Sequence, residues 1–178
     1  MARRVVLVSG VPGTGKSIVA GPLAAELGFG LLGKDRIKEV LGDALAADSG
    51  PVDQAMSRRL GAAAMELLWA LAADLPAVVL DANFWVDDER LPGRLRALSA
   101  RPVEVHCTCP VALAAQRYQA RSVSRHPVHA QGGAGAILAP EHIARSGRPV
   151  GAGPVITVDT AGPVDVPALA AAVRILLP

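Results

Sequence analysis

A glycine-rich segment near the start of the chain has the residue types and spacing of a phosphate-binding loop. It fits the pattern GxxxxGK[ST] at every fixed position, follows the apolar run 5–8 and precedes a helical pattern over 17–27. Its residues are Gly10, Val11, Pro12, Gly13, Thr14, Gly15, Lys16 and Ser17. The glycines let backbone N–H groups point at an anion, the lysine reaches the β- and γ-phosphates, and the serine hydroxyl can bind Mg²⁺. We expect this loop to bind ATP or GTP.

Asp35 has the position expected of a catalytic base. It follows residues 28–33, which we expect to form a turn and a short buried strand, and it begins a segment with apolar residues at helical spacing. Ligands of open parallel sheets bind at the carboxyl ends of the strands. An aspartate there could accept the proton of a substrate hydroxyl, with Arg36 beside it as a further substrate contact. The alternative is that Asp35 only caps the following helix.

A second acidic position is expected at the end of the apolar run 77–81, which is typical of a strand buried on both faces. Asp81 could hold Mg²⁺ together with Ser17, contact the substrate, or be only a polar strand end. Asn83, Phe84 and Trp85 follow it, and we expect them at the substrate. The two aromatic rings could form a flat wall of the pocket or pack in the core.

Three arginines, Arg117, Arg121 and Arg125, recur at i, i+4 and i+8 in a segment that lacks carboxylates. On one helix they would share a face, and like charges at this spacing destabilise a helix by about 0.2–0.5 kcal/mol per pair. A triphosphate would relieve this repulsion, because guanidinium groups bind phosphate oxygens. We expect all three to be catalytic and Arg117 also to bind the nucleotide. The alternative is a solvated basic face.

Two histidines border the glycine-rich stretch 131–135, which we expect to be the most flexible part of the chain. His126 and His129 would then belong, with the arginines, to a lid of about residues 117–145 that closes over the phosphates. We expect these histidines to be part of the lid structure or to contact the substrate, rather than to bind a metal.

Length and composition fit one domain without a nucleic-acid or membrane surface. The 178 residues are 51% hydrophobic and carry a formal net charge of +2, and no apolar run approaches the roughly 20 residues of a membrane span. Cys107 and Cys109 are spaced too closely for an unstrained disulfide, so reduced thiols are expected rather than zinc ligands. We expect a cytoplasmic protein, and the sequence leaves the oligomeric state open.

Apolar runs and helical periodicities alternate along residues 1–178. The remaining strands are expected at 103–107 and 155–158, and the remaining helices at 35–45, 52–75, 87–100, 110–124, 141–145 and 166–177. Alternation of helices with nearly all-apolar strands predicts an α/β domain, a parallel sheet covered by helices on both faces. Pro22 is expected to bend the first helix, and the loop that binds the base is expected near residues 151–153.

The loop, Asp35, Asp81 and the arginines that follow Gln116 together resemble the chloramphenicol phosphotransferase family. More widely, the chain is similar to small P-loop kinases that include shikimate kinase, adenylylsulfate kinase and zeta toxin. This resemblance implies the P-loop NTPase fold, with a five-stranded parallel sheet of order 2-3-1-4-5, and Mg²⁺-dependent transfer of a γ-phosphate to a hydroxyl. It also implies that Asp35 is the base and that the three arginines belong to the lid. Residues 83–85 and 126–129 depart from the family pattern, so the pocket does not carry over.

The sequence therefore predicts a Mg²⁺-dependent kinase of a small hydroxylated molecule, an antibiotic or a nucleoside- or sugar-like natural product, in a self-protection role. One alternative is a zeta-toxin-like kinase of nucleotide sugars or a kinase of a primary metabolite. A different class of protein, a nucleotide-dependent regulator that signals through the lid, is the other alternative. No nucleic-acid or membrane partner is expected.

Overall fold

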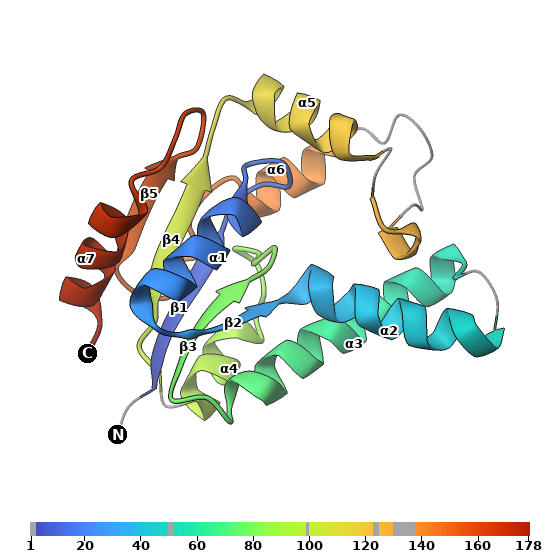
Figure 1. Ribbon diagram of the computed structural model, residues 1–178, viewed down its shortest axis with the longest axis horizontal. Coiled ribbons are helices and arrows are strands. Elements are labelled where there is room, and N and C mark those ends of the chain that lie inside the picture. Colours follow the sequence, from blue (N-terminus) through green and yellow to red (C-terminus); the bar gives the residue numbers. More distant parts are fainter. Residues whose placement is uncertain (1–2, 50–51, 99, 123–124, 130–137) are drawn as a thin grey trace.

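The computed structural model describes residues 3–49, 52–98, 100–122, 125–129 and 138–178. Its centre is a parallel sheet of five strands in the order β2-β3-β1-β4-β5 (Figure 1). The strands are β1 (Arg4–Ser9), β2 (Gly30–Gly33), β3 (Ala77–Asp81), β4 (Val103–Thr108) and β5 (Val155–Asp159). The α/β class, the parallel sheet and the strand order that the sequence and the resemblance predicted are confirmed.

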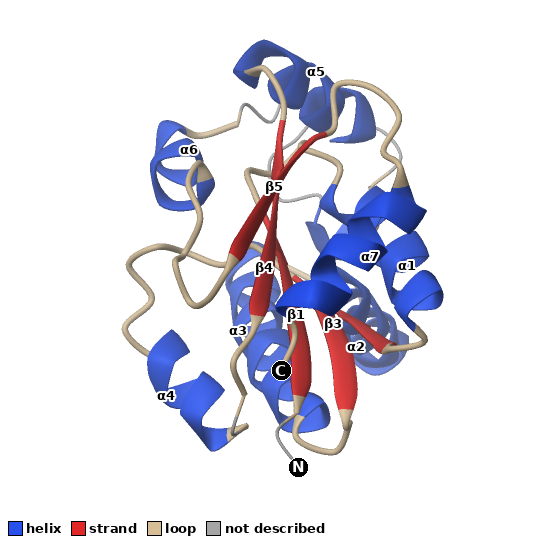
Figure 2. Ribbon diagram, turned by 90° about the vertical axis from the view of Figure 1, so that its left-hand side faces the viewer, coloured by secondary structure: helices blue, strands red, loops and turns tan. Residues whose placement is uncertain are grey.

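Helices connect the strands and cover both faces of the sheet. They are α1 (Lys16–Leu27), α2 (Lys34–Ser49), α3 (Gln54–Ala72), α4 (Leu91–Ala97), α5 (Val111–Ser122), the 3₁₀ helix η1 (Pro127–His129), α6 (Pro140–Ser146) and α7 (Val166–Leu176). In Figure 2, α1 and α7 lie on one side of the sheet and α3 and α4 on the other. The alternation of side chains along β1 explains this arrangement, because Val6 and Val8 pack against α1 and α7 while Val5 and Leu7 pack against α3 and α4.

Several element boundaries differ from the expectation. The strand β2 is not buried, since Leu31 is 46% exposed, because β2 lies at an edge of the sheet. The helix α1 continues through Pro22, as expected, whereas α4 begins at Leu91 rather than at residue 87. Asp165 is the N-cap of the last helix, with Ala168 N donating to its Oδ1 at 3.0 Å. The expected flexible stretch 131–135 lies outside the described residues.

The two cysteines are free thiols in different surroundings. Cys107 lies in β4 and is 1% exposed, and this burial raises the pKa of its thiol to about 12, whereas Cys109 is half-buried. At pH 8 we expect a disulfide reagent such as DTNB to leave Cys107 unmodified in the folded protein and to modify both thiols in 6 M guanidinium. Rapid modification of two thiols in the folded state would contradict the burial of Cys107. Among the described residues, no helix is both long and apolar enough to cross a bilayer.

Candidate active site

The phosphate-binding loop connects the end of β1 at Ser9 to the start of α1 at Lys16. Three of its glycines have positive φ, 135° at Gly10, 98° at Gly13 and 79° at Gly15, a backbone that other residues rarely adopt. The loop is fixed from behind by Thr160, whose hydroxyl donates to Thr14 O at 2.6 Å. The backbone amides at the start of α1 therefore face the cavity in a conformation set before a ligand binds.

The helix α5 lies directly over this loop. A Cβ atom added at Gly13 would lie 2.1 Å from Ala114 O, a backbone atom of α5 that cannot easily move. Val11 and Ala114 also belong to one small apolar cluster. Close approach of α5 is thus built into the glycine pattern of the loop.

Replacing Gly13 by alanine is expected to lower both stability and nucleotide binding. The positive φ costs about 1–3 kcal/mol, and the contact with Ala114 O adds to it. Gly21→Ala is the matched control, because Gly21 is inside α1 with nothing within 4 Å of its added Cβ. We expect Gly21→Ala to stabilise the protein by about 0.5–1 kcal/mol. Denaturant unfolding and triphosphate titration measure both effects; equal behaviour of the two variants would contradict the packing of α5 on the loop.

The Lys16 ammonium is buried beneath the loop. Its Nζ donates to Gly10 O at 2.8 Å and Val11 O at 3.1 Å. Burial lowers the pKa of Lys16 to about 8, against the opposing effects of the nearby Asp81 and Asp35 carboxylates. A triphosphate would give this cation the anionic partner that the loop carbonyls only partly replace.

Ser17 and Asp81 form a pair at the mouth of the loop. The Ser17 side chain hydrogen-bonds the Asp81 carboxylate, and both line the same cavity. Burial raises the pKa of Asp81, while the bond to Ser17 and the Lys16 charge oppose that rise. A hydroxyl and a buried carboxylate are a donor set that fits Mg²⁺, which keeps several waters and binds phosphate oxygens as its other ligands. Among the described residues, no group of three or more His, Cys, Asp or Glu side chains is arranged so that it could hold a metal ion.

Asp35 faces the same cavity from the first turn of α2. The helix begins at Lys34, so Asp35 lies inside the first turn rather than at the N-cap position. Its carboxylate interacts electrostatically with the Lys16 ammonium and the Asp81 carboxylate, and its Oδ2 lies 3.9 Å from Arg125 Nη2. The side chain is 59% exposed, and an acceptor could therefore reach it.

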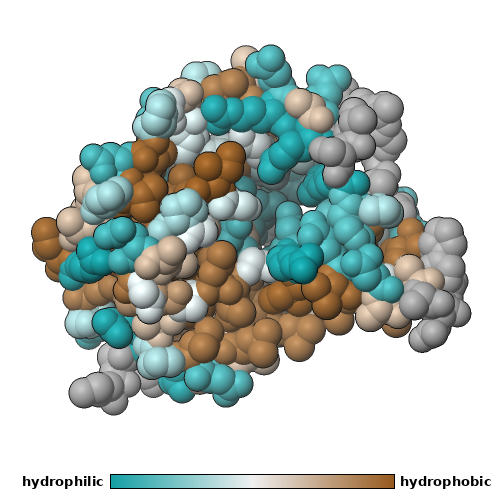
Figure 3. Space-filling model, in the orientation of Figure 1, coloured by the Kyte–Doolittle hydropathy of each residue, from teal (hydrophilic) through white to brown (hydrophobic). Residues whose placement is uncertain are grey.

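The cavity has a volume of about 450 Å³ and separates the loop and α5 from α2. Figure 3 shows hydrophilic side chains gathered around this recess. Its lining comprises Pro12, Gly13, Gly15, Lys16, Ser17, Lys34, Asp35, Lys38, Glu39, Asp81, Ala82, Asn83, Tyr118, Arg121, Arg125, His126, His129 and His142. A cavity of this size accepts the terminal phosphates of a nucleotide together with a small molecule.

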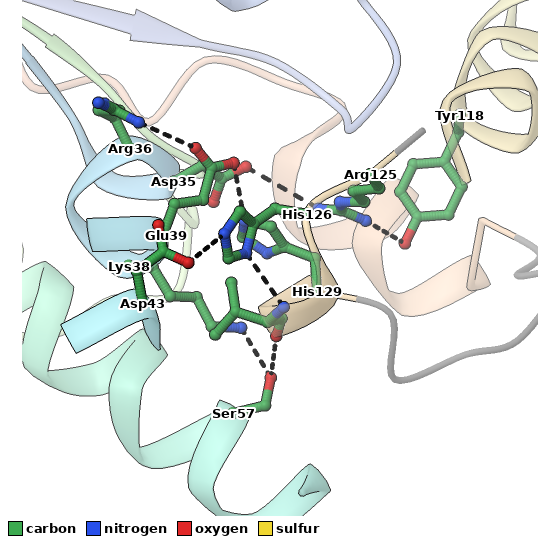
Figure 4. Close-up of polar contacts among 11 residues, drawn as sticks. Asp35, Arg36, Lys38, Glu39, Asp43, Ser57, Tyr118, Arg125, His126 and His129 are labelled. Atoms are coloured by element: carbon green, nitrogen blue, oxygen red, sulfur yellow. Dashed lines mark hydrogen bonds and ion pairs between the residues drawn. The ribbon is translucent and has the colours of Figure 1, made fainter. Parts of the chain in front are cut away.

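The three arginines do not share one helix face. Because α5 ends at Ser122, Arg125 follows the helix instead of continuing it. Arg121 and Arg125 line the cavity, but Arg117 is not among its lining residues and donates to Thr160 O at 3.0 Å. Figure 4 shows Arg125 between Tyr118 and Asp35. Arg117 thus lies beside the residue that supports the loop.

Of the two alternatives for the aromatic rings, core packing describes Phe84. Phe84 is 3% exposed and packs against Trp69 of α3, with ring centroids 6.0 Å apart. Trp85 lies against the Arg145 guanidinium at 3.6 Å and lines a second cavity. Arg36, also expected at the substrate, lies 4.0 Å from Glu39 and is not among the residues that line the first cavity.

Both predicted histidines contact α2. His126 Nε2 lies 2.9 Å from Asp43 Oδ1, and His129 Nε2 lies 3.4 Å from Glu39 Oε1 (Figure 4). They line the cavity, as does Asn83. Sequence reasoning missed Lys34 and Lys38, the two other lysines at this cavity; their proximity to Asp35 in sequence was the available signal.

The expected base-binding loop at residues 151–153 lies at the wrong end of the sheet. Gly151 N donates to Glu104 Oε2 at 3.1 Å, and a Cβ on Gly153 would lie 2.0 Å from Pro102 O, before the start of β4. The segment that follows β5 begins at Thr160, which contacts the phosphate loop instead. That segment, rather than 151–153, borders the nucleotide side.

The fold and the cavity define the chain as a small P-loop kinase-type protein. Residues 5–134 match the family model described as AAA domain, and the chain belongs to this family of P-loop proteins.

Solved structures agree with this assignment. A candidate kinase from Chloroflexus aurantiacus J-10-fl is 30% identical, with a TM-score of 0.83 over 100% of each chain. Shikimate kinase from Acinetobacter baumannii (18% identity, TM-score 0.54, 98% of this chain and 92% of that one) shares the fold. So does a gluconokinase from Sinorhizobium meliloti 1021 (16%, 0.53, 98% and 94%). No significant match was found among proteins of curated function.

Proposed function

We propose that the protein transfers the γ-phosphate of ATP or GTP to a hydroxyl group of a small molecule, with Asp35 as the general base. The observation that carries this proposal is that the phosphate loop, Asp35, the Ser17–Asp81 pair and two arginines all line one and the same cavity. A phosphate donor and an alcohol can meet there, and each group needed for phosphoryl transfer has a candidate residue.

In this mechanism, Asp35 takes the proton of the acceptor hydroxyl as its oxygen forms a bond to the γ-phosphorus. The bond from that phosphorus to the β,γ-bridging oxygen breaks, and the nucleoside diphosphate leaves. Lys16, Arg121 and Arg125 offset the charge on the phosphoryl oxygens. Ser17, together with Asp81 directly or through water, would hold Mg²⁺, which would supply positive charge that neutralises part of the phosphate charge. We infer that residues 117–145 act as a lid over these groups.

The acceptor that we favour is an antibiotic or a nucleoside- or sugar-like natural product, which the protein would inactivate by O-phosphorylation. The resemblance to the chloramphenicol phosphotransferase family supports this choice. The similar folds of a shikimate kinase and a gluconokinase, named for hydroxylated acids, support a small hydroxylated acceptor more generally. His126, His129, Asn83 and Asp81 would contact it from the cavity wall.

The direct test is incubation with γ-labelled ATP or GTP, Mg²⁺ and a panel of hydroxylated antibiotics, nucleosides and sugar acids, followed by mass spectrometry. We expect one acceptor class to gain the mass of a single phosphate in an EDTA-sensitive reaction. Nucleotide binding with no transfer to any hydroxyl, and only slow hydrolysis, would favour a nucleotide-dependent regulator.

A further inference from the structure

The cavity contains more positive charge than the phosphate loop alone would need. Its described lining includes five Lys or Arg side chains and three carboxylates. Lys16 and Arg121 lie close enough to Asp81 to affect its pKa, and thus belong to the phosphate side. Lys34, Lys38 and Arg125 belong to the opposite side, where α2 faces the segment after α5. This opposite side is where the acceptor would bind.

All lysines of the chain lie at this one cavity. Of the eighteen Lys and Arg residues, only Lys16, Lys34 and Lys38 are lysine, and all three line this cavity. Lysine presents a compact ammonium, whereas arginine presents a broad planar fork. Every other basic position of the chain is arginine, so lysine occurs only around this cavity. Lys16 belongs to the phosphate loop, which leaves Lys34 and Lys38 for another role.

Lys34 and Lys38 converge although no carboxylate of the described residues forms an ion pair with either. They are four residues apart on α2, a spacing at which like charges cost about 0.2–0.5 kcal/mol. Both side chains reach the same point on α3, because a Cβ atom added to Gly61 would lie 3.9 Å from Lys34 Nζ and 3.9 Å from Lys38 Cε. Within the described part of the chain, Lys34 has no hydrogen-bond or ion-pair partner, and Lys38 Nζ donates to the neutral Ser57 Oγ at 2.8 Å. Burial, and then the Lys34 charge, lower the pKa of Lys38.

His129 adds an unpartnered polar atom to the same wall. Its side chain is 5% exposed, and its Nε2 makes no hydrogen bond within the described residues, with Glu39 Oε1 at 3.4 Å. Burial and the charges of Arg125, Lys38 and Lys34 lower the pKa of His129, against the effect of Asp35. Figure 4 shows His129 and Lys38 on neighbouring sides of one space between α2, α3 and η1. The carboxylates here, Glu39 and Asp35, already lie near other cations.

We propose that Lys34, Lys38 and His129 form a subsite for an anionic group, a carboxylate or a phosphate, that the acceptor carries in addition to its reacting hydroxyl. This inference rests on the proposed function, because it places the hydroxyl at Asp35, next to Lys34 in the first turn of α2. The ammonium groups receive from the ligand the negative partner that the described protein side chains do not supply. Acceptors without an anionic group are bound weakly.

Lys38 also has a structural contact, which makes Lys34 the better residue to test. Ser57 Oγ, the acceptor of the Lys38 bond, donates in turn to Val128 O at 2.7 Å, so Lys38 supports η1. Among the described residues, Lys34 has no such contact, and Lys34→Gln removes its charge with little change in shape. Lys34→Arg keeps the charge, and Arg101→Gln removes one charge at an exposed position near the amino end of β4.

The experiment is calorimetric titration of the whole protein saturated with Mg²⁺ and the β,γ-imido analogue of the triphosphate that it binds. Filling the loop in this way prevents probe anions from binding there. The probes are inorganic phosphate and acetate, with glycerol as the neutral control. We expect at least one anion to bind more tightly than glycerol, and Lys34→Gln to weaken that binding about tenfold or more. Lys34→Arg should weaken it less, and Arg101→Gln should leave it unchanged. The stronger of the two anions identifies the chemistry of the acceptor group.

Two results would overturn the subsite. One is that neither anion binds more tightly than glycerol, and the other is that Lys34→Gln binds the anion as well as Arg101→Gln. Failure of the kinase proposal looks different: Lys34-dependent anion binding without phosphorylation of any hydroxyl leaves the subsite standing and removes the kinase. Conversely, an acceptor that carries a carboxylate or phosphate and is phosphorylated with equal kcat/KM by the wild type and Lys34→Gln removes the subsite and leaves the kinase.

Discussion

Lys16→Met is expected to lower kcat for phosphoryl transfer by about 10²–10³-fold, the effect of removing one preorganised charge from the reacting oxygens. The affinity for the triphosphate should also fall, by about tenfold or more, because a charged hydrogen bond to phosphate is lost. Methionine keeps the length and apolar stem of lysine, so the change removes mainly the ammonium.

Stability separates this effect from unfolding. Burial lowers the pKa of Lys16 to about 8, so below that pH the folded state holds a charge that would be better solvated in the unfolded chain. Removing the charge at pH 7 should therefore not lower the unfolding temperature. Single-turnover transfer, triphosphate titration and thermal unfolding together check the prediction, with Arg101→Met as the control. Transfer at the wild-type rate would exclude Lys16 from catalysis.

Much of the fold follows from local sequence, but the exposure of each strand does not. Uninterrupted apolar runs predicted β1 and β3, and the structure buries both. The shorter apolar run of β2 was also expected to be buried, yet Leu31 is exposed because β2 has a neighbour on one side only. Position in the sheet depends on pairing between distant segments, and an apolar run in isolation contains no information about it.

The site shows the same division between local and distant information. Every residue of the phosphate loop could be read from its motif, because the chemistry resides in the backbone and in adjacent side chains. The placement of Phe84 could not, since it depends on Trp69, which α3 brings to it from fifteen positions earlier. The helix end at Ser122 separates Arg125 from α5, and helical spacing alone did not indicate that end.

Lys34 and Lys38 line the cavity but were not predicted from the sequence, although lysine is rare in this chain. The rarity of lysine is visible in the composition, but composition alone does not show where in the fold the lysines lie. Once the cavity is known, the same fact separates the lysines from the remaining basic residues, because all of them share one ligand space. The rarity of lysine indicates a binding site only when the fold is known, because the fold brings Lys16 of α1 close to Lys34 and Lys38 of α2.

Asp35→Asn is expected to lower kcat by about 10²–10⁴-fold, the usual contribution of a general base, while the dissociation constant of the triphosphate changes little. Asparagine has nearly the same shape, and the lost interaction of the charge with the helix dipole costs only about 0.3–1 kcal/mol, so α2 should keep its structure in the variant. The loss of the carboxylate removes the proton acceptor and its contact with Arg125, 3.9 Å away.

The control is Asp74→Asn, which changes an exposed carboxylate between α3 and β3. This position lies at the amino end of the strands, whereas the phosphate loop lies at the carboxyl end. Initial rates of phosphate transfer and triphosphate titration distinguish the possible roles of Asp35. Loss of transfer with intact nucleotide binding assigns it to the acceptor proton. Unchanged transfer in Asp35→Asn would show that Asp35 is not the general base. The Asp35 carboxylate would then hold α2 in place, through contacts such as the one with Arg125, and would take no part in the chemistry.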